Sequence, residues 1–134
     1  MTVGLDTTVV VRLLIGKPED LAAVALDYVL ERAQAGDRVL VSDWVVAESY
    51  YALQYHYQVS KKDTLGALRS LFTTPGIQAS AEMGEVLSTR NLESAKPGFI
   101  DRLIHSNYLR AGAVEVATFE RAAAKLSGVR VLSA

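Results

Sequence analysis

Short β-branched runs alternate with longer stretches of helical spacing along this chain, and that alternation limits its fold more than any other feature. The short runs predict strands at residues 3–5, 39–41, 77–79, 114–117 and 129–132. Apolar spacing with Gly or Pro punctuation predicts helices at residues 9–15, 18–35, 44–57, 60–72, 82–94, 97–111 and 120–126. Because strands that alternate with helices pair in parallel, we expect an α/β fold with helices on both faces of a central sheet. Ligands then bind beyond the carboxyl ends of the strands.

The length of 134 residues suits one domain over residues 1–134. Half of the residues are hydrophobic, yet no run approaches the roughly eighteen apolar residues of a membrane span, so we expect a globular domain without a membrane partner. Cysteine is absent, which excludes disulfides, thiol nucleophiles and thiolate zinc sites. The first residues contain neither a basic start nor a secretory core, so the expected location is cytoplasmic.

Fourteen basic and fifteen acidic side chains leave a net charge of −1. Non-specific coating of nucleic acid is therefore not expected, because it draws on a broad positive surface. The informative question is how the acids are placed, since most acids are solvated and an acid in apolar surroundings needs an explanation.

Two acids directly follow predicted strands. Asp6 comes after the first strand, and Glu120 comes just past the strand at residues 114–117. Either residue could instead start the next helix, Asp6 as an N-cap and Glu120 as a first-turn acid behind Thr118. Both placements lie at the ligand edge of the sheet, and the two interpretations stay open at this point.

Two further acids stand among apolar residues on predicted helices. Trp44 and Tyr51 lie four and three residues from Glu48, so we expect its carboxylate in an apolar stripe. A lone buried carboxylate is costly unless it is paired, protonated or bound to a cation. The alternative for Glu48 is a salt bridge to a neighbouring arginine. The alternative for Asp101 is a favourable charge near a helix N-terminus.

If these four acids meet at one edge of the sheet, their mutual repulsion requires a cation. Two carboxylates within about 4 Å repel by roughly 4 kcal/mol at an effective dielectric of about 20. Oxygen ligands without cysteine or paired histidines favour magnesium or manganese over zinc. His56 and His105 stand alone on separate helices, and we assign them no role. The expected cofactor is therefore Mg²⁺ or Mn²⁺.

At these four acids the chain resembles the PIN-domain ribonucleases, in particular the VapC type of toxin from prokaryotic toxin–antitoxin pairs. The segment from Leu5 to Leu14 is similar to the family's first motif, in which an Asp ends the first strand. Residues 45–48 resemble the second motif, residues 98–104 the third and residues 113–132 the last. Each motif is weak alone, but the four occur in order and span nearly the whole chain.

The resemblance implies a three-layer α/β/α domain around a parallel sheet of four to five strands. It implies an endoribonuclease that uses Mg²⁺ or Mn²⁺ to hydrolyse RNA phosphodiester bonds. Asp6 and Asp101 are the implied metal ligands, and Glu48 and Glu120 complete the acidic cluster. Thr118 is implied as an assisting residue. A homodimer and a small antitoxin protein that blocks the cleft are the implied partners.

Two positions depart from the family's pattern. Glu120 stands where the family usually has Asp, and Thr8 stands where Asn is common. These changes motivate a second hypothesis, a catalytically weak or inactive PIN-fold protein that acts through a partner. A phosphotransferase of the haloacid-dehalogenase type is disfavoured, because it needs a second Asp two residues after Asp6 and this chain has Thr8 there.

Half of the aromatic residues crowd into and just after one predicted helix. They are Trp44, Tyr50, Tyr51, Tyr55 and Tyr57. Core packing is the plainer expectation for such a group, and base stacking or a subunit contact are its alternatives.

Overall fold

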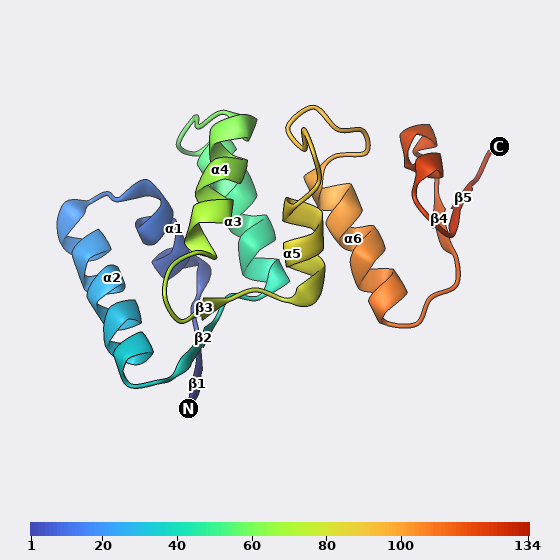
Figure 1. Ribbon diagram of the computed structural model, residues 1–134. Helices are drawn as coiled ribbons and strands as arrows, with labels where there is room; N and C mark the ends of the chain where they lie inside the picture. Colours follow the sequence, from blue (N-terminus) through green and yellow to red (C-terminus); the bar gives the residue numbers. More distant parts are fainter. The chain divides into compact units, whose positions relative to one another are not determined.

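The computed structural model describes residues 1–134, and it divides into two compact units, Met1–Ser80 and Ala81–Ala134 (Figure 1). Together the units contain six α-helices and five short strands, so the predicted α/β class is confirmed. The assignment of residues 1–134 to one domain stays a prediction. None of the helices has both the length and the apolar character that crossing a membrane requires.

The first unit contains a three-stranded parallel sheet in the order β1-β2-β3. Its strands are β1 (Thr2–Gly4), β2 (Arg38–Leu40) and β3 (Ile77–Gln78). The buried Val39 at the centre pairs in register with Val3 on one side and Ile77 on the other. All three predicted strands of this unit are therefore confirmed, and their carboxyl ends point the same way.

Four helices complete the first unit: α1 (Thr7–Ile15), α2 (Glu19–Gln34), α3 (Asp43–Tyr55) and α4 (Lys61–Leu71). Local sequence signals set their ends. Gly16 stops α1 in the left-handed conformation at φ 74°. The Ser42 and Ser60 hydroxyls accept hydrogen bonds from Val45 N and Asp63 N and begin α3 and α4. These helices confirm the predictions for residues 9–15, 18–35, 44–57 and 60–72 to within a few residues.

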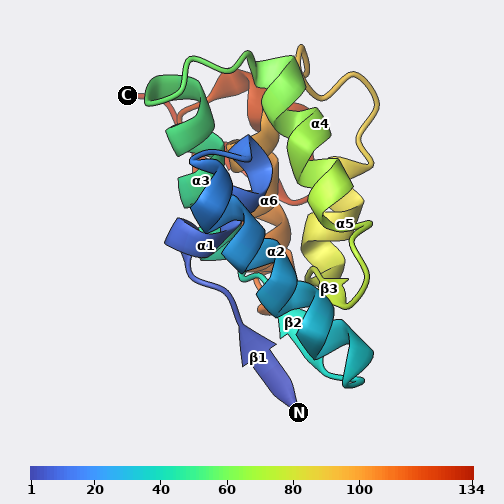
Figure 2. The same cartoon turned by 90° about the vertical axis from the view of Figure 1, so that its left-hand side faces the viewer.

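The core of the first unit lies where α1 packs on α2, α3 and α4, beyond the carboxyl ends of the strands (Figures 1 and 2). Fully buried side chains from these helices and from β2 fill it: Val10, Val29, Val39, Val46, Leu53, Leu65 and Leu68. On α2 only Ala25 and Val29 are buried, whereas Leu21, Val24 and Tyr28 of the predicted apolar stripe are exposed. Fewer residues of α2 are thus buried than the spacing of its apolar residues predicts.

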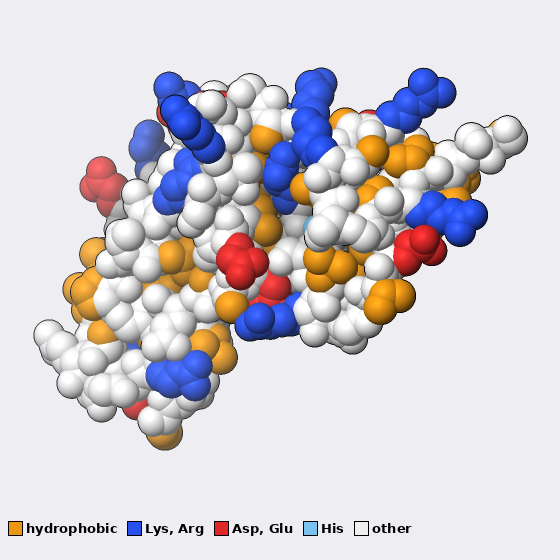
Figure 3. Space-filling model, turned by 45° about the vertical axis from the view of Figure 1, so that its right-hand side comes forward, with side chains coloured by type: hydrophobic (Ala, Val, Ile, Leu, Met, Phe, Trp, Pro, Cys, Tyr) orange, Lys and Arg blue, Asp and Glu red, His pale blue; other side chains and the backbone are white.

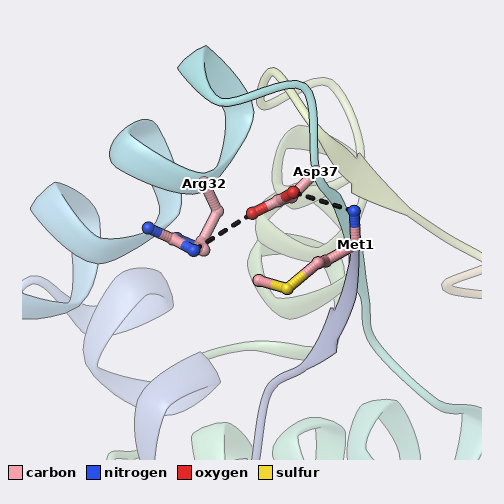
Figure 4. Close-up of polar contacts among 3 residues, drawn as sticks. All are labelled: Met1, Arg32 and Asp37. Carbon is pink, nitrogen blue, oxygen red and sulfur yellow. Dashed lines mark hydrogen bonds and ion pairs between the residues drawn. The ribbon is translucent and has the colours of Figure 1, made fainter.

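A buried carboxylate ties the start of the chain to the end of α2 (Figure 4). Asp37 precedes β2 and is 8% exposed. It accepts hydrogen bonds from the Met1 ammonium at 3.0 Å and from Arg32 Nη1 at 3.1 Å. Two cationic donors offset the cost of removing this carboxylate from water. Asp37 therefore has a structural role, and the sequence did not place it among the candidate site residues.

A glycine before β3 allows close contact between that strand's entry and α2. Gly76 has φ +82°, and a Cβ added there would lie 2.9 Å from the Ala33 Cβ. We expect Gly76→Ala to lower the free energy of unfolding by about 1–3 kcal/mol, from left-handed strain and from overpacking. Urea denaturation followed by circular dichroism measures the change.

Gly66 provides the matched control for that substitution. It lies inside α4, and a Cβ added there would meet nothing within 4 Å. Gly66→Ala is expected to raise the free energy of unfolding by about 0.5–1 kcal/mol, because alanine loses less backbone entropy in a helix. Shifts of the same sign in both variants would contradict the packing assigned to Gly76.

The second unit contains α5 (Ala81–Leu87), α6 (Phe99–Arg110), a 3₁₀ helix η1 (Arg121–Lys125), and a parallel pair of strands, β4 (Val116–Thr118) and β5 (Val129–Val131). Arg110 Nε on α6 lies 3.3 Å from Glu82 Oε1 on α5. His105 Nε2 lies 2.6 Å from the Ser127 carbonyl oxygen. These contacts connect α6 to both ends of the unit and give His105 a structural partner.

The predicted helix at residues 82–94 is wrong in its second half. The helix α5 ends at Leu87, and turns follow. The Ser88 hydroxyl donates to the Gly84 carbonyl at 2.7 Å, and Asn91 adopts a left-handed φ of 54°. Such local side-chain bonds and left-handed residues compete with helical continuation.

The prediction of one sheet with four to five strands is met only in part. All five strands form and pair in parallel, but hydrogen bonds join three of them in one sheet and two in another. At 2–3 residues each, the strands are shorter than the apolar runs that predict them. The short predicted helix at residues 120–126 forms as the 3₁₀ helix η1.

Candidate functional site

Asp6 lies between β1 and α1, at the carboxyl edge of the three-stranded sheet. It occupies the N-cap position of α1, but its side chain makes no capping hydrogen bond. The Thr8 hydroxyl donates to Asp6 Oδ2 at 3.4 Å, so the position that departs from the family's Asn still contacts this carboxylate. Asp6 is exposed. The capping role considered for its side chain is therefore wrong, and the carboxylate is available to a ligand.

Glu48 lies on α3, the helix that follows β2, and its placement corrects two expectations. Its side chain is exposed rather than buried in an apolar stripe. No arginine pairs with it; instead the Thr7 hydroxyl donates to Glu48 Oε1 at 3.0 Å. The neighbouring positions Trp44 and Tyr51 are exposed as well, which removes the desolvation cost argued from spacing.

Thr7 joins these two acids. It is the first residue of α1, directly after Asp6, and it reaches across to Glu48 on α3. The sequence did not mark Thr7 as a site residue, although a hydroxyl directly after the first acid is the signal that could have done so. Because β1 and β2 are parallel neighbours, the segments after both strands emerge at the same edge. The structure thus places Glu48 in hydrogen-bond contact with the residue next to Asp6, and neither acid forms an ion pair within its unit.

The other three candidate residues belong to the second unit. Asp101 is exposed in the first turn of α6, as expected for a charge near a helix N-terminus. Glu120 is exposed between β4 and η1, with no side-chain capping bond. The Glu120 backbone N–H donates to Thr118 Oγ1 at 3.0 Å. Thr118 therefore orients the turn that carries Glu120, and the convergence of Asp101 and Glu120 with Asp6 and Glu48 stays a prediction.

The acids of the first unit offer carboxylate oxygens, the ligand type that a hard divalent cation prefers. Within either unit, no three acidic or histidine side chains form a group that could hold a metal ion. Magnesium, however, is often held by only one or two carboxylates and keeps several waters for substrate phosphates. Asp6 and Glu48 supply such a pair of exposed oxygen donors. Asp6 and Asp101 as joint metal ligands remain a prediction.

The expectation that the aromatic group packs in the core is right for Tyr50 alone. Tyr50 is 6% exposed, and burial raises the pKa of its phenol above the ordinary value. Trp44 is 83% exposed and Tyr55 72%, while Tyr51 and Tyr57 are about half as exposed at 45% and 39%. Most of the aromatic surface of α3 thus faces solvent, beside Glu48.

Lysine and arginine side chains lie in several separate groups on the face drawn in Figure 3, with acidic and uncharged side chains among them. Arg12, at the end of α1, donates from Nη1 to the Lys17 carbonyl at 2.9 Å and to the Tyr57 hydroxyl at 3.3 Å. Arg102 donates from Nε to the Pro97 carbonyl at 2.7 Å. The Arg12–Tyr57 contact places a cation just beyond the end of α3. The sequence did not predict this contact.

Comparison of the chain with models of protein families, with curated proteins and with solved structures found no match. The assignment of a function therefore depends on the site residues and on the family resemblance of the sequence.

Proposed function

We propose that this protein is a Mg²⁺- or Mn²⁺-dependent endoribonuclease of the PIN type, and the toxic component of a toxin–antitoxin pair. The observation that carries the proposal is the pair of exposed carboxylates, Asp6 and Glu48, connected through Thr7 at the carboxyl edge of a parallel sheet. In such sheets this edge is where ligands bind. The order of the four acidic motifs along the chain supports the same conclusion.

The residues of the first unit have distinct roles in this proposal. Asp6 supplies a carboxylate that no helix cap or cation of its unit occupies, and Thr8 orients it through Oδ2. Glu48 supplies the second carboxylate, and Thr7 restrains its Oε1. A divalent cation held by these carboxylates would make its bound water more acidic and would stabilise the charge that develops on a phosphate.

The proposal also assigns roles to the second unit. It requires Asp101 as a further metal ligand and Glu120 as a member of the acidic cluster, with Thr118 holding the turn of Glu120. It requires the two parallel sheets to act as the centre of one three-layer α/β/α domain. A homodimer, a small antitoxin that blocks the cleft and a cytoplasmic location follow from the family resemblance and are part of the proposal.

The direct test is cleavage of end-labelled single-stranded RNA by the purified full chain. We expect internal cleavage with Mg²⁺ or Mn²⁺ and none in excess EDTA, because the proposed reaction uses a divalent cation to stabilise the charge that develops on the phosphate. Calorimetric titration with Mn²⁺ accompanies the assay. Absence of both cleavage and Mn²⁺ binding at millimolar metal would favour the non-catalytic PIN-fold protein that acts through a partner.

A further inference from the structure

One side of α3 carries exposed aromatic rings on both sides of the Glu48 carboxylate. Trp44, Glu48, Tyr51 and Tyr55 follow one another at spacings of four, three and four residues, which places them on one face of the helix. We call Trp44, Tyr51 and Tyr55 the aromatic face. At a rise of about 1.5 Å per residue, Glu48 lies about 6 Å along the helix axis from Trp44 and about 4.5 Å from Tyr51.

The tyrosines of the aromatic face are held in defined orientations. The rings of Tyr51 and Tyr55 stack with centroids 6.0 Å apart and an interplanar angle of 21°. The buried Tyr50 packs edge-on against Tyr51, with centroids 5.4 Å apart at 71°. Because these contacts restrain the rings before any ligand arrives, less conformational entropy is lost when a flat ligand stacks on them.

The charged groups near the start of α3 differ in sign from those beyond its end. The acids Asp6 and Glu48 lie toward the start of α3. Beyond its end, Arg12 contacts the Tyr57 hydroxyl at 3.3 Å and the carbonyl of Lys17, whose side chain is exposed. A polyanion on the aromatic face can therefore meet cations at one end and, where a divalent cation is bound, the proposed metal site at the other.

We propose that the aromatic face binds the unpaired bases of single-stranded RNA, one base on Trp44 and the next on Tyr51, so that the phosphodiester between them lies over Glu48. This inference rests on the proposed function, because it takes Glu48 as part of the nuclease site. Every base presents a π face, so such stacking tolerates many sequences. Bases inside a duplex are already stacked on one another, which makes the expected substrate unpaired RNA.

A second copy of the chain fits this face less well than RNA. A dry protein interface over the aromatic face would bury Glu48, whose only partner is the Thr7 hydroxyl, and burial of a carboxylate without a cation costs several kcal/mol. A nucleic-acid strand leaves the carboxylates hydrated, or bound to the divalent cation that the proposed reaction uses. The acid in the middle of the aromatic face thus disfavours a dry protein interface, and the aromatic rings on both sides of it supply the attraction for stacked bases.

Trp44 gives a direct probe of this binding because it is the only tryptophan of the chain. We expect a single-stranded RNA oligonucleotide to quench its fluorescence saturably in EDTA, where the proposed cleavage cannot occur. The same oligonucleotide annealed to its complement should quench it weakly. Equal quenching by duplex and single strand, or no quenching by either, would overturn the proposal.

Variants test the two proposed stacking rings by fluorescence anisotropy of labelled RNA in EDTA. Trp44→Ala and Tyr51→Ala should each weaken binding about 5- to 100-fold, as the loss of a stacking ring does. Trp44→Phe and Tyr51→Phe should retain most of the affinity. Tyr28→Ala, which removes a half-exposed ring from α2, is the matched control and should leave the affinity unchanged. Equal affinities in all variants would contradict the stacking.

The outcomes separate this inference from the proposed function. Metal-dependent cleavage by the wild type without quenching of Trp44 would remove the aromatic face from the site and leave the nuclease proposal intact. Quenching by single-stranded RNA without metal-dependent cleavage would support the binding surface and remove the nuclease. A dimer that dissociates on Trp44→Ala, with Trp44 emission that depends on protein concentration alone, would assign the face to a second copy and overturn the inference.

Discussion

Asp6→Asn is expected to lower metal-dependent RNA cleavage by about 100-fold or more while leaving the fold intact. Replacing the groups that merely orient metal ligands costs about 10- to 100-fold, so replacing a ligand itself should cost at least the upper figure. The fold should persist because the Asp6 side chain makes no capping bond, and asparagine is as good an N-cap as aspartate. Initial rates of RNA cleavage at saturating Mn²⁺ measure the effect.

Asp27→Asn is the matched control for this substitution. Asp27 is an exposed acid on α2, away from the residues of the sheet edge. The substitution removes the same single negative charge as Asp6→Asn. Its cleavage rate should equal that of the wild type. Calorimetry provides a second readout, since Asp6→Asn should weaken Mn²⁺ binding and Asp27→Asn should not. Full cleavage activity in Asp6→Asn would remove Asp6 from the site and, with it, the proposed function.

Leu53→Ala is expected to produce a large loss of stability in the first unit. Leu53 is 1% exposed on the side of α3 that faces the core, and α3 packs against α1 and α4. Truncating a fully buried leucine removes its transfer free energy and leaves a cavity, which together cost about 2–5 kcal/mol. Urea denaturation followed by circular dichroism measures the change in the free energy of unfolding.

Leu26→Ala separates burial from residue type. Leu26 is 43% exposed on α2, so the same truncation there should change stability by only about 0.5 kcal/mol. A loss at Leu26 as large as that at Leu53 would show that the exposed side of α2 is covered in solution. A small loss at Leu53 would contradict the core described for the first unit.

Helix positions in the first unit followed from local signals in the sequence. Gly16 stops α1, and Ser42 and Ser60 begin α3 and α4, each through hydrogen bonds to residues three or four places away. Such signals act within one turn and need no tertiary partner. The prediction failed at residues 88–94 for the same kind of reason, because Ser88 bonds back to Gly84 and ends α5.

The candidate site shows where local signals stop being informative. The sequence predicted Asp6 directly after a strand and Glu48 on the helix that follows the next strand, and the structure adds the Thr7 hydrogen bond to Glu48. Spacing also predicted Glu48 in an apolar stripe, with a salt bridge to an arginine as the alternative, and the structure shows neither. Exposure depends on which elements pack on a helix, and those elements are distant in sequence.

The helix α3 shows most clearly what the sequence determined by itself and what tertiary structure decided. Its sequence specifies a helix with large apolar side chains on two opposite sides, Val46 and Leu53 on one and Trp44, Tyr51 and Tyr55 on the other. Periodicity cannot choose between two apolar sides of equal strength. Packing of α1 and α4 buries the aliphatic side, because branched side chains interdigitate there, and leaves the aromatic rings beside Glu48 in solvent.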